Sequence, residues 1–587
     1  MRVSKTVAVL SLIALSACAQ QPAKQPKAVL PVLHIAEAGS STMHGAAKKA
    51  DTADATLPKE ALTDRILFQT LLGEIALQRG QSQVAISTYL DLARETRDPR
   101  IAQRATEIAW SAQDTDAALD AAMLWEQTAP DSRQARQIVA ALLISQSRLD
   151  EARPRLEQWL KDDPKQTGRS FLQLSGLVAH DSDRGGVLKL MQTLAVPYPK
   201  VPEAHLAVAQ AALNDGKTGL ALKESRRALE LRPDWDTAVL FQAQVLQQRS
   251  PDAALHYLHD YLEQHPHAKT VRLAYARLLV TDRQYPQARN EFRTLLADHP
   301  DNPEITMALG LLSLQLKDYD DADANFRRAL TNGFKDTDAV KLYLGEVDDA
   351  RGRPQDAIEW YESVSPGRHY IPARARVARI MAKQGKLDAA RRYLQATPVS
   401  DTMQRVLVVQ AESSLLRENK QYEAAYDVLD AALKKRPNNA DLLYDHAMAA
   451  EQINRLDVME ANLRRLIKLR PNYAQAYNAL GYTYADRDER LPEARKLIAK
   501  ALKLAPNDPF IMDSMGWVLY RMGKIDDSYG YLSRAFALQP DPEIAAHLGE
   551  VLWHQGKHAD ARKVWRTALQ DHPDNEVLQK TVKRFVR

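Results

Sequence analysis

A repeat near the C-terminus constrains the fold of this chain more than any other feature. Three copies of one pattern follow each other between Ala474 and Pro573, each with a glycine in its first half and a proline at its end. The prolines are Pro506, Pro540 and Pro573, which lie 34 and then 33 residues apart. A period of this length predicts a helix, a turn and a second helix, stacked many times along the chain.

Small residues in the repeat explain how the two helices of a pair pack. Gly481, Gly516 and Gly549 fall where the first helix of each pair crosses the second, and Ala494 and Ala561 fall at the crossing on the second helix. Glycine costs about 1 kcal/mol of helix propensity against alanine, so we expect a close approach of the two backbones to offset that cost. The larger residues expected to fill the space between pairs are Ile498, Leu532 and Trp565.

These spacings resemble the consensus of the tetratricopeptide repeat (TPR). The resemblance implies an all-α fold, a right-handed TPR superhelix or α-solenoid, in which each helix pair buries its apolar faces against its neighbours. Weaker copies of the pattern begin near residue 61, and the pattern fades over residues 165–201, near Pro366 and near Pro398. The expected segments are N-terminal TPR-like repeats over 61–201, central repeats over 202–400, consensus repeats over 401–573 and a capping helix over 574–587.

The charge balance argues against nucleic acid as a partner. The 587 residues include 79 Lys and Arg against 75 Asp and Glu, a formal net charge of +4. Phosphate binding needs basic side chains concentrated on one face rather than a mixed surface. We therefore expect no nucleic acid, although RNA-binding helical repeats are the alternative to be tested.

The single cysteine of the chain lies at the end of a short apolar run. Arg2 and Lys5 precede about ten apolar residues, a run too short for a bilayer span of about 20 residues, so residues 1–17 predict a signal peptide. The run ends in Leu-Ser-Ala-Cys, which resembles the lipobox of bacterial lipoproteins and implies that Cys18 is lipidated. An ordinary cleaved signal with an accidental cysteine is the alternative.

Residues 18–60 predict a lipidated flexible tether, because Gln, Pro, Ala, Lys, Ser and Thr dominate them. About 40 such residues could reach about 140 Å when fully extended. Ala19 follows the cysteine where an aspartate would retain an enterobacterial lipoprotein in the inner membrane. This resemblance implies a location in the outer membrane, lipid-anchored and facing the periplasm.

No pattern of residues predicts catalysis, so we expect no enzyme, no catalytic residue and no cofactor. The chain has no phosphate-binding glycine loop, no Gly-x-Ser-x-Gly and no His-Glu-x-x-His. The best metal candidate is the cluster of His256, His259, His265 and His267 with Asp260. The repeat register places residues 256, 259 and 260 on the solvent side of a second helix, which favours a polar outer face over a zinc site.

Aromatic residues gather where the first helices of the C-terminal pairs are expected to line a concave surface. Helical spacing turns repeat positions 2, 5, 9, 12 and 13 into that surface. Tyr, Trp and Arg dominate the energies of protein interfaces, so these positions predict a protein-binding groove. The alternative is that the tryptophans only pack between neighbouring first helices. The predicted groove residues are Tyr444, Asn478, Tyr482, Asp513, Trp517, Tyr520, Arg521 and Trp553.

The lipobox, the polar tether and the C-terminal segments YNALGYTYADR, DSMGWVLYRMGK and PEIAAHLGEVLWHQGK together resemble the large TPR lipoproteins of pseudomonads and related proteobacteria. The resemblance implies a scaffold or adaptor that binds a periplasmic carboxyl-terminal processing serine protease. It further implies that the scaffold presents peptidoglycan hydrolases to the protease and so controls cell-wall hydrolysis. The alternative is an assembly lipoprotein, of the pilotin type, for a secretin, a pilus or an exopolysaccharide export machine.

Overall fold

The computed structural model describes residue 58, residues 61–179 and residues 181–586, and it is helical throughout that part, without a strand. The predicted all-α fold of the α-solenoid class is therefore confirmed. The predicted signal peptide, Cys18 and nearly all of the predicted tether lie outside the described residues. Among the described residues, none of the helices has the length and apolarity that crossing a bilayer requires.

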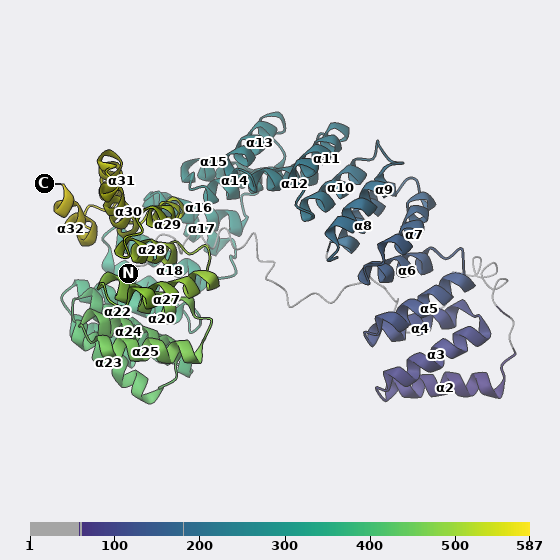
Figure 1. Cartoon of the computed structure of the whole chain (residues 1–587), viewed down its shortest axis with the longest axis horizontal. Helices are drawn as coiled ribbons and strands as arrows, with labels where there is room; N and C mark the ends of the chain where they lie inside the picture. The colour runs from purple at the N-terminus through teal and green to yellow at the C-terminus, as the bar shows by residue number, and fades with distance from the viewer. Residues whose placement is uncertain (1–57, 59–60, 180, 587) are drawn as a thin grey trace. The chain divides into compact units, whose positions relative to one another are not determined.

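The chain divides into two compact units, one ending at Asn332 and the other comprising Gly333–Arg587. The helices of the first unit, drawn from purple to teal in Figure 1, are α2 (Asp64–Gln78), α3 (Ser82–Thr96), α4 (Pro99–Ser111), α5 (Thr115–Thr128), α6 (Arg133–Ser145), α7 (Leu149–Asp162), α8 (Thr167–Val178), α9 (Arg184–Ala195), α10 (Pro202–Asn214), α11 (Thr218–Leu231), α12 (Asp236–Gln247), α13 (Pro251–Gln264), α14 (Lys269–Thr281), α15 (Tyr285–Asp298), α16 (Pro303–Gln315) and α17 (Tyr319–Thr331).

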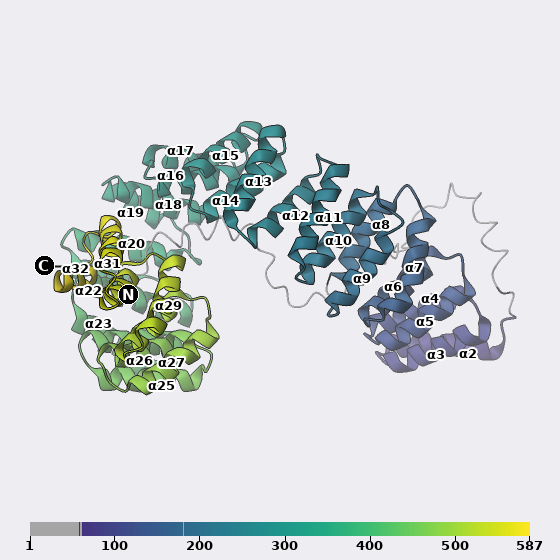
Figure 2. The same ribbon diagram turned by 45° about the horizontal axis from the view of Figure 1, so that its top comes forward.

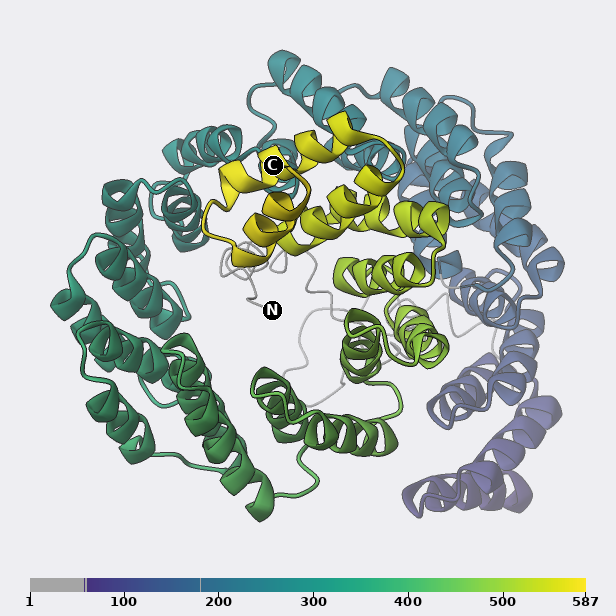
Figure 3. The ribbon, with the colours of Figure 1, turned by 60° about the vertical axis from the view of Figure 1, so that its left-hand side comes forward.

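The second unit continues the same alternation of helices, drawn from green to yellow in Figure 3. Its helices are α18 (Thr337–Ala350), α19 (Pro354–Glu362), α20 (Tyr370–Lys383), α21 (Leu387–Ala396), α22 (Thr402–Glu418), α23 (Tyr422–Lys435), α24 (Ala440–Gln452), α25 (Leu456–Leu469), α26 (Ala474–Asp486), α27 (Leu491–Leu504), α28 (Pro509–Arg521), α29 (Ile525–Leu538), α30 (Pro542–His554), α31 (His558–Asp571) and α32 (Glu576–Phe585).

Prolines and capping side chains set where the helices of each pair end and begin. Helix α27 ends two residues before Pro506, which has no amide proton to donate and cannot continue a helix. The Asp508 side chain then accepts from the backbone N–H groups of Phe510 and Ile511, and Pro509 occupies the first turn of α28. The same order recurs along the array, so the sequence sets where each helix starts and stops.

The helices of a pair approach closely at the predicted glycines. A Cβ added at Gly481 would lie 2.7 Å from Ile498 Cγ1, and one added at Gly516 would lie 2.5 Å from Leu532 Cγ. At Gly549 the added Cβ would lie 2.0 Å from Trp565 Nε1. Only glycine fits at such contacts, which explains why the sequence accepts its cost in helix propensity.

The weakened pattern over residues 165–201 corresponds to a pair that packs differently. In most pairs of the first unit the two helices pack firmly on each other, as α10 and α11 do in Figure 2. Helices α8 and α9 instead pack mainly against α10. The sequence signal fades here because the close crossing of the two helices is absent.

Two second helices in the second unit are short. Helix α19 has 9 residues and α21 has 10, whereas α23, α25, α27, α29 and α31 have 14 each. The buried apolar residues form small clusters around Tyr361 and around Leu394, separate from the large cluster that runs from Val406 to Leu519. The loops after the short helices contain the predicted soft points at Pro366 and Pro398.

Candidate functional site

The predicted groove residues lie on the first helices of four successive pairs. Tyr444 belongs to α24, and Asn478 and Tyr482 to α26. Helix α28 carries four of the residues and α30 carries Trp553. Because α28 packs directly against both α26 and α30, the side chains of these three helices lie within reach of one another.

An aromatic stack joins α26, α28 and α30. The Trp517 ring stacks on the ring of His547 with 4.2 Å between centroids, and on Tyr520 with 5.2 Å. The Tyr482 ring is tilted against the ring of His547, with centroids 6.3 Å apart. The Arg521 guanidinium lies 5.9 Å from the Trp517 ring centroid. We call these residues, together with Asn478 on α26, Asp513 on α28 and Glu550 on α30, the aromatic face.

A buried ion pair holds the middle of the aromatic face. His547 Nδ1 lies 2.9 Å from Asp513 Oδ1 and 3.0 Å from Oδ2, and both side chains are buried. Burial alone would lower the pKa of His547, but the adjacent Asp513 carboxylate raises that pKa above its usual value. The predicted set included Asp513 but missed His547. The repeat period could have revealed it, because His547 lies 34 residues after Asp513.

A second network fixes the edge of the aromatic face toward the C-terminus. The Tyr520 hydroxyl donates to Glu550 Oε1 at 3.0 Å, and Arg584 pairs with the other oxygen of Glu550. Burial and the Glu550 carboxylate raise the pKa of the Tyr520 hydroxyl, so it stays a hydrogen-bond donor. Arg521 NH2 lies 3.3 Å from Asp488 Oδ2, which orients its guanidinium beside Trp517.

Two polar atoms of the face have no hydrogen-bond partner among the described residues. They are Trp517 Nε1, on a side chain that is 6% exposed, and Asn478 Oδ1. A buried polar group without a partner costs about 1 to 3 kcal/mol. The indole N–H can donate a hydrogen bond, and the amide oxygen can accept one.

Acidic groups lie on α24 and near Tyr482 of the aromatic face. Burial raises the pKa of Asp445 and of Glu451, which accept hydrogen bonds from Gln410 at 2.6 Å and from Thr483 at 3.3 Å. Burial also raises the pKa of Tyr482 well above its usual value, with nearby carboxylates adding to the shift.

Two of the predicted residues lie apart from the stack. Trp553 stacks on Trp565 with 5.8 Å between centroids and lies 6.0 Å from the Phe585 ring, so it belongs to the packing of α30 to α32. Tyr444 lies 5.8 Å from Tyr473, and burial raises the pKa of the Tyr444 hydroxyl to about 12. The structure thus brings together Tyr482, Asp513, Trp517, Tyr520 and Arg521, with Asn478 on the same helix as Tyr482.

The histidine cluster of α13 has the predicted exposure. Residues 256, 259 and 260 are exposed, whereas Ala254 and Leu258 are buried. His256 Nδ1 bonds to the Asp252 carbonyl at 2.7 Å, and His265 stacks on Tyr261. The described residues that could together reach one metal ion are His259, Asp260 and Glu263, all exposed. Exposed groups of this kind suit a solvated surface.

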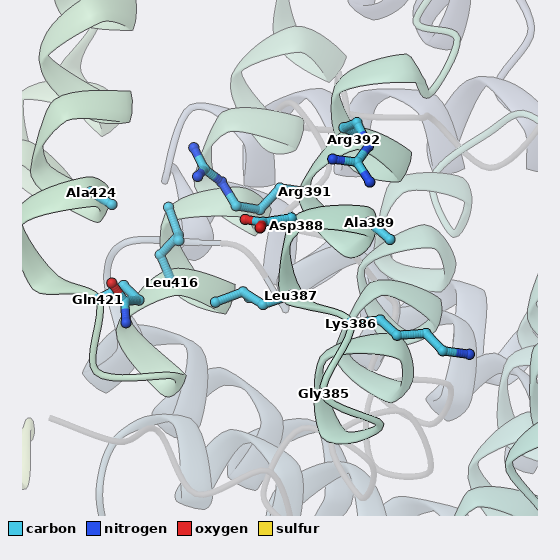
Figure 4. A pocket seen from close by; sticks show the side chains of 10 residues that line it. All are labelled: Gly385, Lys386, Leu387, Asp388, Ala389, Arg391, Arg392, Leu416, Gln421 and Ala424. Carbon is cyan, nitrogen blue, oxygen red and sulfur yellow. The ribbon is translucent and has the colours of Figure 1, made fainter.

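A cavity of about 520 Å³ lies between the start of α21 and helices α22 and α23. Figure 4 shows its cationic side chains, which do not converge on one point. Arg391 Nε donates to Glu412 at 3.1 Å, and Lys386 and Arg392 extend away from Leu416. The cavity therefore lacks the concentrated charge of an anion-binding site.

Models of the tetratricopeptide repeat match four stretches of the chain, residues 245–312, 316–366, 444–509 and 514–576. The TPR repeat-containing protein PA4667 of Pseudomonas aeruginosa is 34% identical over 524 residues, which cover 88% of each chain. The cellulose synthase operon protein C of Pseudomonas fluorescens is 24% identical over 293 residues, or 46% of this chain and 22% of that protein.

Solved structures match the chain at low sequence identity. The TPR protein TTC0263 of Thermus thermophilus is 23% identical over 30% of this chain and 95% of its own, with a TM-score of 0.28. A chain of the Naa15/Naa10 complex bound to HypK is 12% identical over 89% of this chain and 96% of its own, with a TM-score of 0.35.

Proposed function

Because the chain belongs to the tetratricopeptide-repeat proteins, a family of protein-interaction scaffolds, we propose that it is an outer-membrane lipoprotein adaptor facing the periplasm. In this proposal it binds a carboxyl-terminal processing serine protease and presents peptidoglycan hydrolases to it. The lipobox at Cys18 and the C-terminal repeats, which resemble those of the protease partner LbcA, support the proposal. The adaptor itself has no catalytic role.

The observation that carries the scaffold role is the aromatic face. It joins aromatic rings of three first helices, of which Tyr482 and Tyr520 are partly exposed, and the donor at Trp517 Nε1 and the acceptor at Asn478 Oδ1 have no partner among the described residues. Tryptophan, tyrosine and arginine supply most of the binding energy at protein interfaces. A protein segment on this face would cover the partly exposed side chains of Tyr482, Tyr520 and Arg521.

Proximity would supply the effect on cell-wall hydrolysis. A protease and a hydrolase held on one array meet at an effective concentration in the millimolar range when the connections are short. The protease would then cleave the hydrolases at a rate that free diffusion at low concentration does not give. Loss of the scaffold would raise hydrolase levels without any change in the protease.

The similarity to the cellulose synthase operon protein favours a second candidate function. In this second candidate, the chain is an assembly lipoprotein of an exopolysaccharide export machine, a secretin or a pilus. Only 22% of that protein is matched, so the similarity is confined to part of its length. The partners that co-purify separate the two candidates.

The test is co-purification from detergent-solubilised membranes, followed by mass spectrometry. The adaptor proposal predicts a carboxyl-terminal processing protease and cell-wall hydrolases with the chain, whereas an export porin or a secretin would support the second candidate. Trp517→Ala with Tyr520→Ala should weaken capture of the partner while helix content stays constant. The matched control is Trp360→Ala with Tyr531→Ala, which changes the same residue types on second helices. Equal capture by both double variants would place the binding surface elsewhere.

A further inference from the structure

Helix α2 at the start of the described array exposes a continuous apolar stripe. The exposed residues recur on one side of the helix, and they are large. They are Leu67 at 46% exposure, Phe68 at 65%, Leu71 at 53%, Leu72 at 37% and Ile75 at 46%. A contiguous apolar surface of this kind on a soluble array marks a place where another element docks.

Two of the stripe's repeat positions are buried in the next pair. Ala105 and Ile108 lie 33 residues after Leu72 and Ile75, and they are 0% and 2% exposed. Helix α4 packs both on its own partner α5 and on α3 of the preceding pair, whereas α2 packs chiefly on α3 among the described residues. The end of the stripe at Leu72 and Ile75 therefore corresponds to positions that are buried in the next pair, where α4 packs on the preceding α3.

The chain itself offers one segment that suits this face. Between Ala19 and Leu57 the large apolar residues are concentrated in the run Val29 to Ile35, with only Met43 and Leu57 outside it. We propose that residues 29–35 (VLPVLHI) dock on the apolar stripe of α2 and close the N-terminal end of the array. This inference goes beyond the scaffold function and does not depend on the identity of any partner.

The length of chain permits the docking. From Ile35 to Asp64, where α2 begins, the chain can extend about 90 Å, and α2 with its 15 residues is about 22 Å long. The run can therefore reach any point of the stripe. The run is also large enough to cover the stripe, because it has five large aliphatic side chains and the stripe has five exposed apolar ones.

The charges around the stripe favour a protein segment over a lipid surface. Helix α2 carries Asp64 and Glu74, and its single arginine, Arg65, lies 3.2 Å from Glu95. Helices that lie on membranes have lysine and arginine along their polar face, which α2 lacks. If a second copy of the chain covered the stripe instead, the apolar residues of the 29–35 run would have no surface on which to dock.

Docking would shorten the connection between the lipid anchor and the array. Only about ten residues, from Ala19 to Ala28, would then link Cys18 to the docked segment. Such a link reaches about 35 Å when fully extended, against about 140 Å for the whole tether. The repeats would stay close to the membrane surface.

Disulfide trapping tests the docking in the full mature chain with Cys18→Ser, which has no other cysteine. Leu33→Cys is combined in turn with Leu67→Cys, Leu71→Cys or Ile75→Cys under mild oxidation. At least one pair should give an intramolecular disulfide in most molecules. The control, Leu33→Cys with Ser87→Cys on the exposed side of α3, should give at least tenfold less.

Hydrogen exchange provides the second measurement. Leu30→Asp with Leu33→Asp should speed amide exchange in α2 about tenfold, because the covering segment is lost. Ser41→Asp with Thr42→Asp adds the same charge outside the run and should leave α2 unchanged. Disulfides only between two chains, protection of α2 only on phospholipid vesicles, or equal exchange in both aspartate variants would overturn the proposal.

Discussion

Trp517→Phe separates a binding role for the indole from a packing role. Phenylalanine keeps an aromatic ring against His547 and Tyr520 but removes the indole N–H, which has no acceptor among the described residues. Relief of a buried unpaired donor should stabilise the chain by about 1 to 3 kcal/mol. The smaller ring gives up about 40 Å² of buried apolar area, which costs about 1 kcal/mol, and a small void adds to that cost. We expect the free energy of unfolding to change by less than about 1 kcal/mol.

The same change should weaken the partner's binding. If the partner accepts a hydrogen bond from Trp517 Nε1, its loss costs about 0.5 to 1.5 kcal/mol, or about twofold to tenfold in affinity. Calorimetry with the co-purified partner measures the affinity. Hydrogen exchange of peptides from α28 and α30 measures the local stability.

Trp565→Phe is the matched control. The Trp565 indole is also buried, but its N–H donates to the Ala546 carbonyl at 3.4 Å and its ring stacks on Trp553 and Phe585. Here the smaller ring loses both area and a hydrogen bond, so we expect a destabilisation of about 2 kcal/mol. Equal destabilisation by Trp517→Phe and Trp565→Phe, with unchanged partner affinity, would refute the binding role and leave Trp517 as a packing residue.

Three further predictions concern the array and its anchor. Gly549→Ala should lower the free energy of unfolding by about 1 to 3 kcal/mol, and with it the urea midpoint, because the added Cβ would fall 2.0 Å from Trp565 Nε1. The control Gly530→Ala, whose added Cβ would have no atom within 4 Å, should raise the free energy of unfolding by about 1 kcal/mol. The raised pKa of His547 means that its ion pair stabilises fully below the unfolded pKa of about 6.5 and less as pH rises through the folded pKa. Urea melts above pH 6.5 should show this decline, and His547→Gln should abolish it. Cys18→Ser should leave the protein unprocessed or mislocalised, and fatty-acid labelling that persists in that variant would contradict lipidation at this residue.

The fold could be predicted from sequence because close contacts leave a strict residue signature. Residue 516 must be glycine because the large side chain of Leu532 fills the space beside it, and a Cβ at residue 516 would lie 2.5 Å from Leu532 Cγ. The pair α8 and α9 gave a weak signal for the converse reason, since its helices pack mainly on α10 and set no such limit on residue size. Local propensity then still forms the helices without fixing how they cross.

The site could be predicted only in part. Repeat positions predicted that Tyr482, Trp517 and Tyr520 share a surface, because that depends on helical spacing alone. The pairing of Asp513 with His547, and of Glu550 with Tyr520 and Arg584, depends on which side chains reach between successive helices. Trp553 fills the same position as other face residues, yet the packing of α32 draws it toward Phe585.

The short helices α19 and α21 have a consequence for how the second unit loses its structure. In a stack that is stabilised by contacts between neighbouring pairs, the weakest interface between two pairs limits the cooperativity of unfolding. The buried clusters around Tyr361 and Leu394 are small, whereas one large cluster runs from Val406 to Leu519. Heat or mechanical load should therefore melt α18 to α21 as a separate block and leave the C-terminal repeats, with their aromatic stack, folded and able to hold a partner.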